Sequence, residues 1–180
     1  MSVLGLAGLD QVLHFAHHAR PDPNLCKHPA LLQRAIIESE QRLVIVSVWI
    51  RAKVVDHEFL GNLETLAKKG VSVTIVFGFG KDRGEREHDE YARESLERLD
   101  TQYPNFRLIR HNKVHAKVLV SDRKFAVSTS FNWLSFKGDL NMSLREEEGF
   151  CVEGTKFVEE YCQDLLGRLI PEHRLDGNSR

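Results

Sequence analysis

Residues 43–50 form the run Leu43-Val44-Ile45-Val46-Ser47-Val48-Trp49-Ile50, in which only Ser47 is polar and most residues are β-branched. Such a run is typical of a strand that is buried on both faces, as in a parallel sheet covered by helices. Residues 57–69 are predicted to form a helix that ends at Gly70. Residues 71–77 form a second apolar, β-branched run. This strand–helix–strand order predicts a parallel pair of strands joined by a right-handed crossover.

The flanking segments extend this unit. The helical spacing of Leu32, Ile36 and Ile37 predicts a helix over residues 29–41, and a charged helix is expected near residues 87–100. Further strands are expected at residues 106–110, 114–121, 125–128 and 148–152, with a turn at 122–124 and a closing helix at 155–170. We therefore expect an α/β protein with a mixed, mostly parallel sheet flanked by helices on both faces.

The two ends of the chain differ from this pattern. Residues 7–19 have the spacing of a short amphipathic helix, and Pro21 and Pro23 interrupt it. We expect residues 1–28 to be an N-terminal arm or helix of unknown role, residues 29–170 to be the functional domain, and residues 171–180 to be a polar tail.

The composition is that of one globular domain. The chain has 180 residues, of which 42% are hydrophobic and 28% are charged, as is usual for a soluble domain with a full core. The net charge of −1 excludes a polycation, so a nucleic-acid surface would have to be local. Residues 107–137 contain seven Lys or Arg residues and one acid, Asp122. This excess favours a phosphate-binding surface, although a solvated basic face would give the same count.

The sequence also indicates a location. No window approaches the roughly 18 uninterrupted apolar residues of a transmembrane helix, and no secretory leader is visible. The cysteines Cys26, Cys151 and Cys162 have no paired spacing, which favours reduced thiols. We expect a cytoplasmic protein without a membrane partner.

The residues best suited to chemistry are polar side chains on or just after the predicted strands: His115, Lys117, Asp122, Ser130, Asn132 and Glu147. Because His115 and Lys117 are two residues apart, their side chains would lie on the same face of a strand, about 7 Å apart. A histidine can attack phosphorus and a lysine can neutralise a phosphate oxygen. Serine and asparagine can donate hydrogen bonds to that oxygen, and a carboxylate can fix the imidazole tautomer. This set predicts a site that cleaves a phosphodiester.

Other features give weaker predictions. The loop Gly78–Gly84 has the glycine spacing of a phosphate-cradling loop but lacks the Gly-Lys-Ser/Thr ending, which favours a mobile loop at the rim of the site. His111 and His115 are four apart on an extended strand and cannot chelate a metal together. His14 and His18 lack an acidic or cysteine partner, so we expect no metal. Trp49 is predicted to be a packing residue.

The motif resembles the phospholipase D superfamily, most closely its small single-motif nucleases. The matching residues are His115-x-Lys117-x4-Asp122, Ser130-Phe131-Asn132-Trp133 and Glu147-Glu148-Gly149-Phe150. The resemblance implies that His115 forms a phosphohistidine intermediate without a metal or other cofactor. It also implies that Lys117, Ser130 and Asn132 hold the phosphate oxygens and that Glu147 orients His115.

Asp122 and Thr129 differ from the other residues of the motif. Asp122 belongs to the signature and is a candidate catalytic residue, but its position in a turn favours a structural role. The family usually has glycine where this chain has Thr129, and a β-branched residue disfavours a positive φ. The loop before Ser130 is therefore expected to differ from the family's, or to present Ser130 less well.

The mechanism implied by the resemblance needs two histidines, and this chain carries the motif once. A homodimer whose two motifs meet at the interface would supply both histidines. We therefore expect the active site to lie at a homodimer interface.

The short single-motif chain favours a nucleic acid as the substrate, with single-stranded DNA ahead of duplex DNA or RNA and little sequence specificity. The candidate contacts are Arg110, Lys113, Trp133 and Lys137, of which Trp133 could instead be a packing residue. Two alternatives stay open: a phospholipase D-type lipid phosphodiesterase, and a non-cleaving nucleic-acid-binding subunit of a larger helicase or defence assembly.

Overall fold

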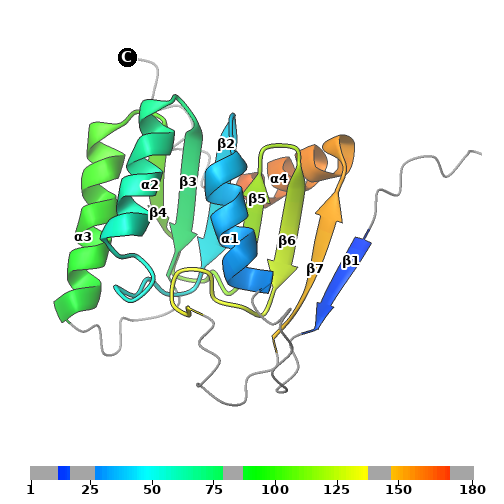
Figure 1. Ribbon diagram of the computed structural model, residues 1–180, viewed down its shortest axis with the longest axis horizontal. Helices are drawn as coiled ribbons and strands as arrows, with labels where there is room; N and C mark the ends of the chain where they lie inside the picture. Colours follow the sequence, from blue (N-terminus) through cyan, green and yellow to red (C-terminus); the bar gives the residue numbers. More distant parts are fainter. Residues whose placement is uncertain (1–11, 17–26, 79–86, 138–146, 171–180) are drawn as a thin grey trace, which may run out of the picture.

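The computed structural model describes residues 12–16, 27–78, 87–137 and 147–170. Seven strands belong to these residues: β1 (Val12–Ala16), β2 (Arg42–Ser47), β3 (Ser72–Phe77), β4 (Phe106–Arg110), β5 (Val118–Ser121), β6 (Phe125–Thr129) and β7 (Glu148–Glu153). The helices are α1 (Lys27–Glu38), α2 (His57–Lys68), α3 (Glu87–Gln102) and α4 (Thr155–Leu169). The strands form one sheet in the order β1-β7-β6-β5-β2-β3-β4 (Figure 1).

The sheet is mixed, as predicted. Strands β2, β3 and β4 are parallel, which confirms the expected crossover from residues 43–50 to residues 71–77. Four of the six neighbouring pairs are antiparallel, so the expectation of a mostly parallel sheet was wrong. The reason lies in the connection between β5 and β6, because the tight turn at residues 122–124 can join only antiparallel neighbours.

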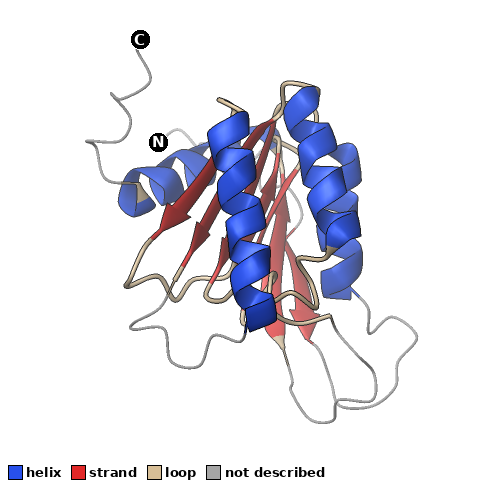
Figure 2. Ribbon diagram, turned by 90° about the vertical axis from the view of Figure 1, so that its left-hand side faces the viewer, coloured by secondary structure: helices blue, strands red, loops and turns tan. Residues whose placement is uncertain are grey.

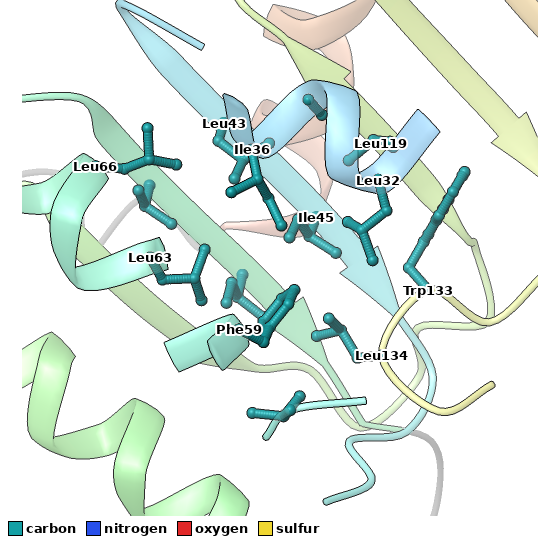
Figure 3. Close-up of a cluster of buried hydrophobic side chains, with 14 of the residues drawn as sticks. Leu32, Ile36, Leu43, Ile45, Phe59, Leu63, Leu66, Leu119, Trp133 and Leu134 are labelled. Atoms are coloured by element: carbon teal, nitrogen blue, oxygen red, sulfur yellow. The ribbon is translucent and has the colours of Figure 1, made fainter. Parts of the chain in front are cut away.

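Helices cover both faces of the sheet (Figure 2). Helices α1, α2 and α3 bury the larger apolar core on one face, where Leu32, Ile36 and Leu63 pack onto strand residues such as Ile45 (Figure 3). Helix α4 buries a smaller core on the other face through Val158, Cys162, Leu165 and Leu169. The apolar run at residues 43–50 supplies both cores in alternation, which explains why β2 has no polar face.

The N-terminal segment differs from the prediction. Residues 12–16, which were expected to be helical, form the edge strand β1 and pair antiparallel with β7. The exposed edge of β7 offers unpaired backbone N–H and C=O groups, and pairing with them outweighs a weak helical periodicity. The described part of the arm is therefore integrated into the sheet.

Strand β5 is shorter than predicted. It begins at Val118, so His115 and Lys117 lie in the segment just before the strand. Its neighbour β2 ends at Ser47, which is opposite Lys117. The ladder between β2 and β5 stops at the pair Val46–Val118, so residues 114–117 have no strand partner on that side. On the other side, the Thr129 backbone N–H donates to the Lys117 carbonyl at 3.0 Å and holds the segment in place.

Some predictions fall outside the described residues: the rim loop beyond Gly78, Cys26 and the tail. Cys151 and Cys162 are buried free thiols, and burial raises the pKa of Cys151 to about 11. None of the helices in the described ranges has the length and apolar character needed to cross a membrane.

Candidate active site

Most of the candidate site residues lie where strands begin or end on one side of the sheet, the lower edge of the sheet in Figure 1. Strands β2, β3, β4 and β6 end at this edge, and β5 and β7 begin there. In an open sheet built around parallel strands, the carboxyl ends of those strands are the usual place for a ligand. The topology therefore brings residues 115–117, 130–132 and 147 to one place.

The side chains of His115 and Lys117 are in contact. Lys117 Nζ lies 3.4 Å from His115 Nε2, closer than the spacing of two residues on a strand would give. His115 is exposed at the edge, whereas Lys117 is only 9% exposed. The imidazole is thus accessible to a substrate, and the ammonium group approaches it from inside the protein.

Glu147 is a buried acid beside this pair. Its carboxylate accepts a hydrogen bond from the Ser130 hydroxyl, and Glu147 is 7% exposed. The neighbouring Glu148 is exposed, but its backbone N–H donates to Ser130 Oγ at 3.0 Å. Ser130 is thereby fixed to the beginning of β7 through both its side chain and its backbone.

Burial and charge act on Lys117 in opposite directions. Desolvation lowers the pKa of the Lys117 ammonium group below its usual value, and the negative charge of Glu147 opposes that lowering. Glu147 thus helps to keep Lys117 protonated in a partly dry environment. A protonated lysine is the form that can stabilise a phosphate oxygen.

Asn132 stands in the sequence between two buried aromatic residues, Phe131 and Trp133, which are 1% and 0% exposed. Its side-chain oxygen is buried and has no hydrogen-bond partner in the described part of the chain. Rotation of the side chain exchanges the positions of its oxygen and nitrogen. A buried amide group without a partner is costly, and a bound ligand would provide one.

Asp122 lies at the other end of β5 and is not part of this site, which corrects its inclusion among the catalytic candidates. It follows Lys117 by five positions, or about 16 Å along an extended chain. Its carboxylate accepts hydrogen bonds from the backbone N–H groups of Glu40, Gln41 and Arg42 at 2.8–3.0 Å. Asp122 therefore fixes the junction between α1 and β2.

The candidate nucleic-acid contacts also change. Trp133 is fully buried and packs against Phe131, with the two ring centroids 5.5 Å apart, so it cannot stack on a base. Lys137 forms an ion pair of 3.1 Å with Asp56, the residue that caps α2. Arg110, at the end of β4, and Lys113 are exposed at or near the edge that carries His115.

The Lys and Arg residues counted in the sequence over residues 107–137 do not all lie near the site. Arg123 pairs with Glu159 at 3.0 Å, and Lys124 pairs with Asp122 at 3.2 Å, both at the edge opposite the site. The positive charge near the site is therefore smaller than the count over residues 107–137 suggested.

Sequence reasoning missed three features of this edge. Trp49, predicted to pack, is 45% exposed just after β2. The Ser47 hydroxyl accepts from the Leu134 N–H at 3.1 Å and donates to the Trp49 carbonyl, which ties β2 to the segment after Asn132. As the one polar residue in an apolar strand, Ser47 was a signal for such a contact. His28, 101 residues before its partner Thr129, gave none.

Thr129 occupies an ordinary extended position. It is the last residue of β6, and Asp122 is the non-glycine residue of the described chain with a positive φ. Position 129 therefore has no left-handed backbone, and a β-branched residue suits its extended conformation. Within the described residues, no group of three or more His, Cys, Asp or Glu side chains is placed to hold a metal ion.

The His–Lys pair, the buried carboxylate and the amide at one end of this α/β sheet supply the nucleophile and the charge-stabilising donors of a phosphodiester-processing protein. Residues 32–167 match the family model described as cardiolipin synthase, PLD-like domain. The chain belongs to this phospholipase D-like family of phosphodiesterases. A comparison with curated protein sequences found no match.

Solved structures share the fold. One is the phospholipase D family member Nuc from Salmonella typhimurium, with a TM-score of 0.59 and 16% identity over 88% of this chain and 93% of that one. NucT from Helicobacter pylori has a TM-score of 0.61 and 13% identity over 89% and 96% of the two chains. Phosphatidylserine synthase from Haemophilus influenzae Rd KW20 has a TM-score of 0.59 and 16% identity over 90% of this chain and 39% of that one.

Proposed function

We propose that the protein is a metal-independent endonuclease that cleaves DNA or RNA through a phosphohistidine intermediate, with single-stranded DNA as its preferred substrate. The observation that carries the proposal is the pair formed by His115 Nε2 and Lys117 Nζ, 3.4 Å apart. At the same edge of the sheet, the Ser130 hydroxyl donates a hydrogen bond to the Glu147 carboxylate.

The proposed reaction has two steps. The exposed His115 attacks phosphorus, so that a P–N bond forms while one P–O bond breaks. The leaving oxygen takes a proton from the His115 of a second copy of the chain, which then removes a proton from water. That water cleaves the P–N bond and frees the histidine. Lys117 and Asn132 stabilise the charge on the phosphate oxygens, and the Ser130 hydroxyl, which donates to Glu147, holds that carboxylate in place. Glu147 keeps Lys117 protonated and orients His115.

The surroundings of the site favour a nucleic acid. Arg110 and Lys113 are exposed cations suited to a polyphosphate backbone. Trp49, 45% exposed beside the same edge, offers an aromatic face on which a base of a single strand can stack. The fold alone does not choose the substrate, because the same fold occurs in a phosphatidylserine synthase.

In the direct test of this function, the wild-type protein should cut labelled single-stranded DNA in the presence of EDTA, because Lys117 takes the place of a metal as the source of positive charge. Duplex DNA, RNA and phosphatidylcholine vesicles complete the substrate set. Loss of cleavage in EDTA with recovery on adding Mg²⁺ would reject the metal-independent mechanism. Hydrolysis of the lipid alone would replace the nuclease assignment with the lipid phosphodiesterase, and binding without cleavage would favour an assembly subunit.

We also propose that the active form is a homodimer, because the reaction needs two histidines and each chain carries the motif once. Sedimentation velocity should find a dimer at micromolar concentration. In addition, wild-type protein mixed with an excess of His115→Ala protein should lose activity per wild-type chain, since each mixed dimer holds one histidine. A fully active monomer, or activity unaffected by the variant, would contradict the shared site.

A further inference from the structure

Thr129 is the connecting point of the candidate site. Its backbone N–H donates to the carbonyl of Lys117 at 3.0 Å. Its hydroxyl donates to the carbonyl of Glu148 at 2.8 Å and accepts from the backbone N–H of Phe131 at 3.1 Å. His28 Nε2 lies 2.8 Å from the same hydroxyl oxygen. One side chain thus joins the start of β7, the loop after β6 and the first turn of α1.

The hydrogen-bonding capacity of the Thr129 hydroxyl determines the role of His28. A hydroxyl has one hydrogen to donate and two lone pairs to accept with. Because the hydrogen goes to the Glu148 carbonyl, His28 Nε2 must be the donor in its contact. The three contacts therefore use the full capacity of the hydroxyl.

The imidazole of His28 is 1% exposed and is held by aromatic contacts. It stacks on Phe131 with ring centroids 4.7 Å apart and an interplanar angle of 15°, and it lies 5.6 Å from Trp133. These two aromatic residues are the neighbours of Asn132 in the sequence. The ring that donates to Thr129 therefore also contacts both residues that flank Asn132 in the sequence.

The neighbouring strand is shaped to accept a threonine at this position. Thr129 is opposite Gly149 in the ladder between β6 and β7. A Cβ atom on residue 149 would lie 2.7 Å from the Thr129 Cβ and 2.8 Å from the Ser128 carbonyl oxygen, too close for either. The glycine at 149 thus leaves the space that the threonine side chain occupies.

We infer that Thr129 and His28 act together as a positioning pair, which sets the placement of Ser130 and Asn132 and thereby tunes the phosphate-binding groups of the site. Neither residue touches the substrate. The inference rests on the proposed function, because the phosphate-binding role of Asn132 and the role of Ser130 in holding Glu147 belong to it. It assigns a purpose to the residue at which this chain departs from the glycine usual in the family.

The first test uses enzyme kinetics on the full chain. Thr129→Val keeps the shape of the side chain but removes the hydroxyl, and it should lower kcat on the order of 10- to 100-fold, because small displacements of positioning groups have effects of that size. Thr129→Ser keeps the hydroxyl and should stay within about threefold of wild type. The matched control is Thr101→Val on α3, where the exposed hydroxyl donates to the Glu97 carbonyl in its own helix.

A double-mutant cycle tests whether the two residues act as one unit. His28→Phe keeps a ring beside Phe131 but removes the donor, and it should lower kcat about as much as Thr129→Val. The double variant should be no more than about twofold worse than either single variant, because each removes the same contact. The inference would be overturned if the two losses in kcat added in the double variant. It would also be overturned if Thr129→Val had the same kcat as Thr101→Val.

A measurement without turnover separates failure of this inference from failure of the proposed function. Amide hydrogen exchange of Phe131, followed by NMR, should be slow in wild type and Thr129→Ser and faster in Thr129→Val. Inorganic phosphate should shift the side-chain amide signals of Asn132 in the first two proteins and much less in the third. If wild type cleaves nothing but these differences hold, the positioning pair stands and the proposed function fails. Unchanged exchange in a folded Thr129→Val protein would reject the pair whatever the activity.

Discussion

Replacing His115 with alanine should lower kcat roughly 10⁴-fold or more, because the nucleophile of the proposed reaction is lost. The melting temperature should stay within a few degrees of wild type, since the side chain is exposed. The matched control is His57→Ala, which removes another exposed histidine, at the first residue of α2. Cleavage by the His115→Ala protein at a rate near that of His57→Ala would rule out the nucleophile assignment.

The intermediate provides a second readout of the same prediction. The wild-type protein is allowed to react with a substrate labelled at the scissile phosphate, and the reaction is then quenched. Label should be trapped on the wild-type protein and not on the His115→Ala protein. Because a P–N bond to imidazole is acid-labile, the trapped label should be released at low pH and retained at high pH. Label that survives acid would point to an ester on a serine or threonine instead.

Replacing Asp122 with alanine should destabilise the fold by about 3–5 kcal/mol, because it leaves three backbone N–H groups at the α1–β2 junction without their acceptor. For a chain of this size, that loss corresponds to a fall in melting temperature of about 10 °C. Asp164→Ala is the control, since it removes a surface carboxylate paired with Arg168 and should cost less than about 1 kcal/mol.

The protein that remains folded should keep its activity per active site, because Asp122 lies at the opposite edge from His115. An Asp122→Ala variant with wild-type stability and no activity would restore Asp122 to the catalytic set. Urea denaturation followed by fluorescence, together with kinetics well below the melting temperature, gives both quantities.

The same carboxylate should make the fold sensitive to acid. Burial alone would raise the pKa of Asp122, but the hydrogen bonds from the backbone of residues 40–42 and from Lys124 outweigh burial and lower it. The folded state therefore binds the proton less readily than the unfolded state. The stabilisation is present above the ordinary aspartate pKa of about 4 and is lost as the pH falls through the lowered folded value.

The elements whose bounds were predicted correctly are those that depend on nearby residues in the sequence. Strand β4, helix α2 and the closing helix lie within one residue of their predicted bounds, because periodicity and a capping or stopping residue decide them. The strand expected at residues 114–121 was too long, because the end of β2 limits it. Likewise, β1 was mistaken for a helix, since its conformation depends on the free edge of β7.

For the site, the sequence by itself determined which residue types are present and in what order. That order indicated both the family and the kind of reaction. Only the tertiary structure decided which of these residues meet. It brought Lys117 to His115, assigned the buried acid to Glu147 and removed Asp122 to the far edge. It also buried Trp133 and exposed Trp49. The physical reason is that burial and hydrogen bonding between residues such as His28 and Thr129 depend on strand order and sheet edges, which are properties of the whole chain.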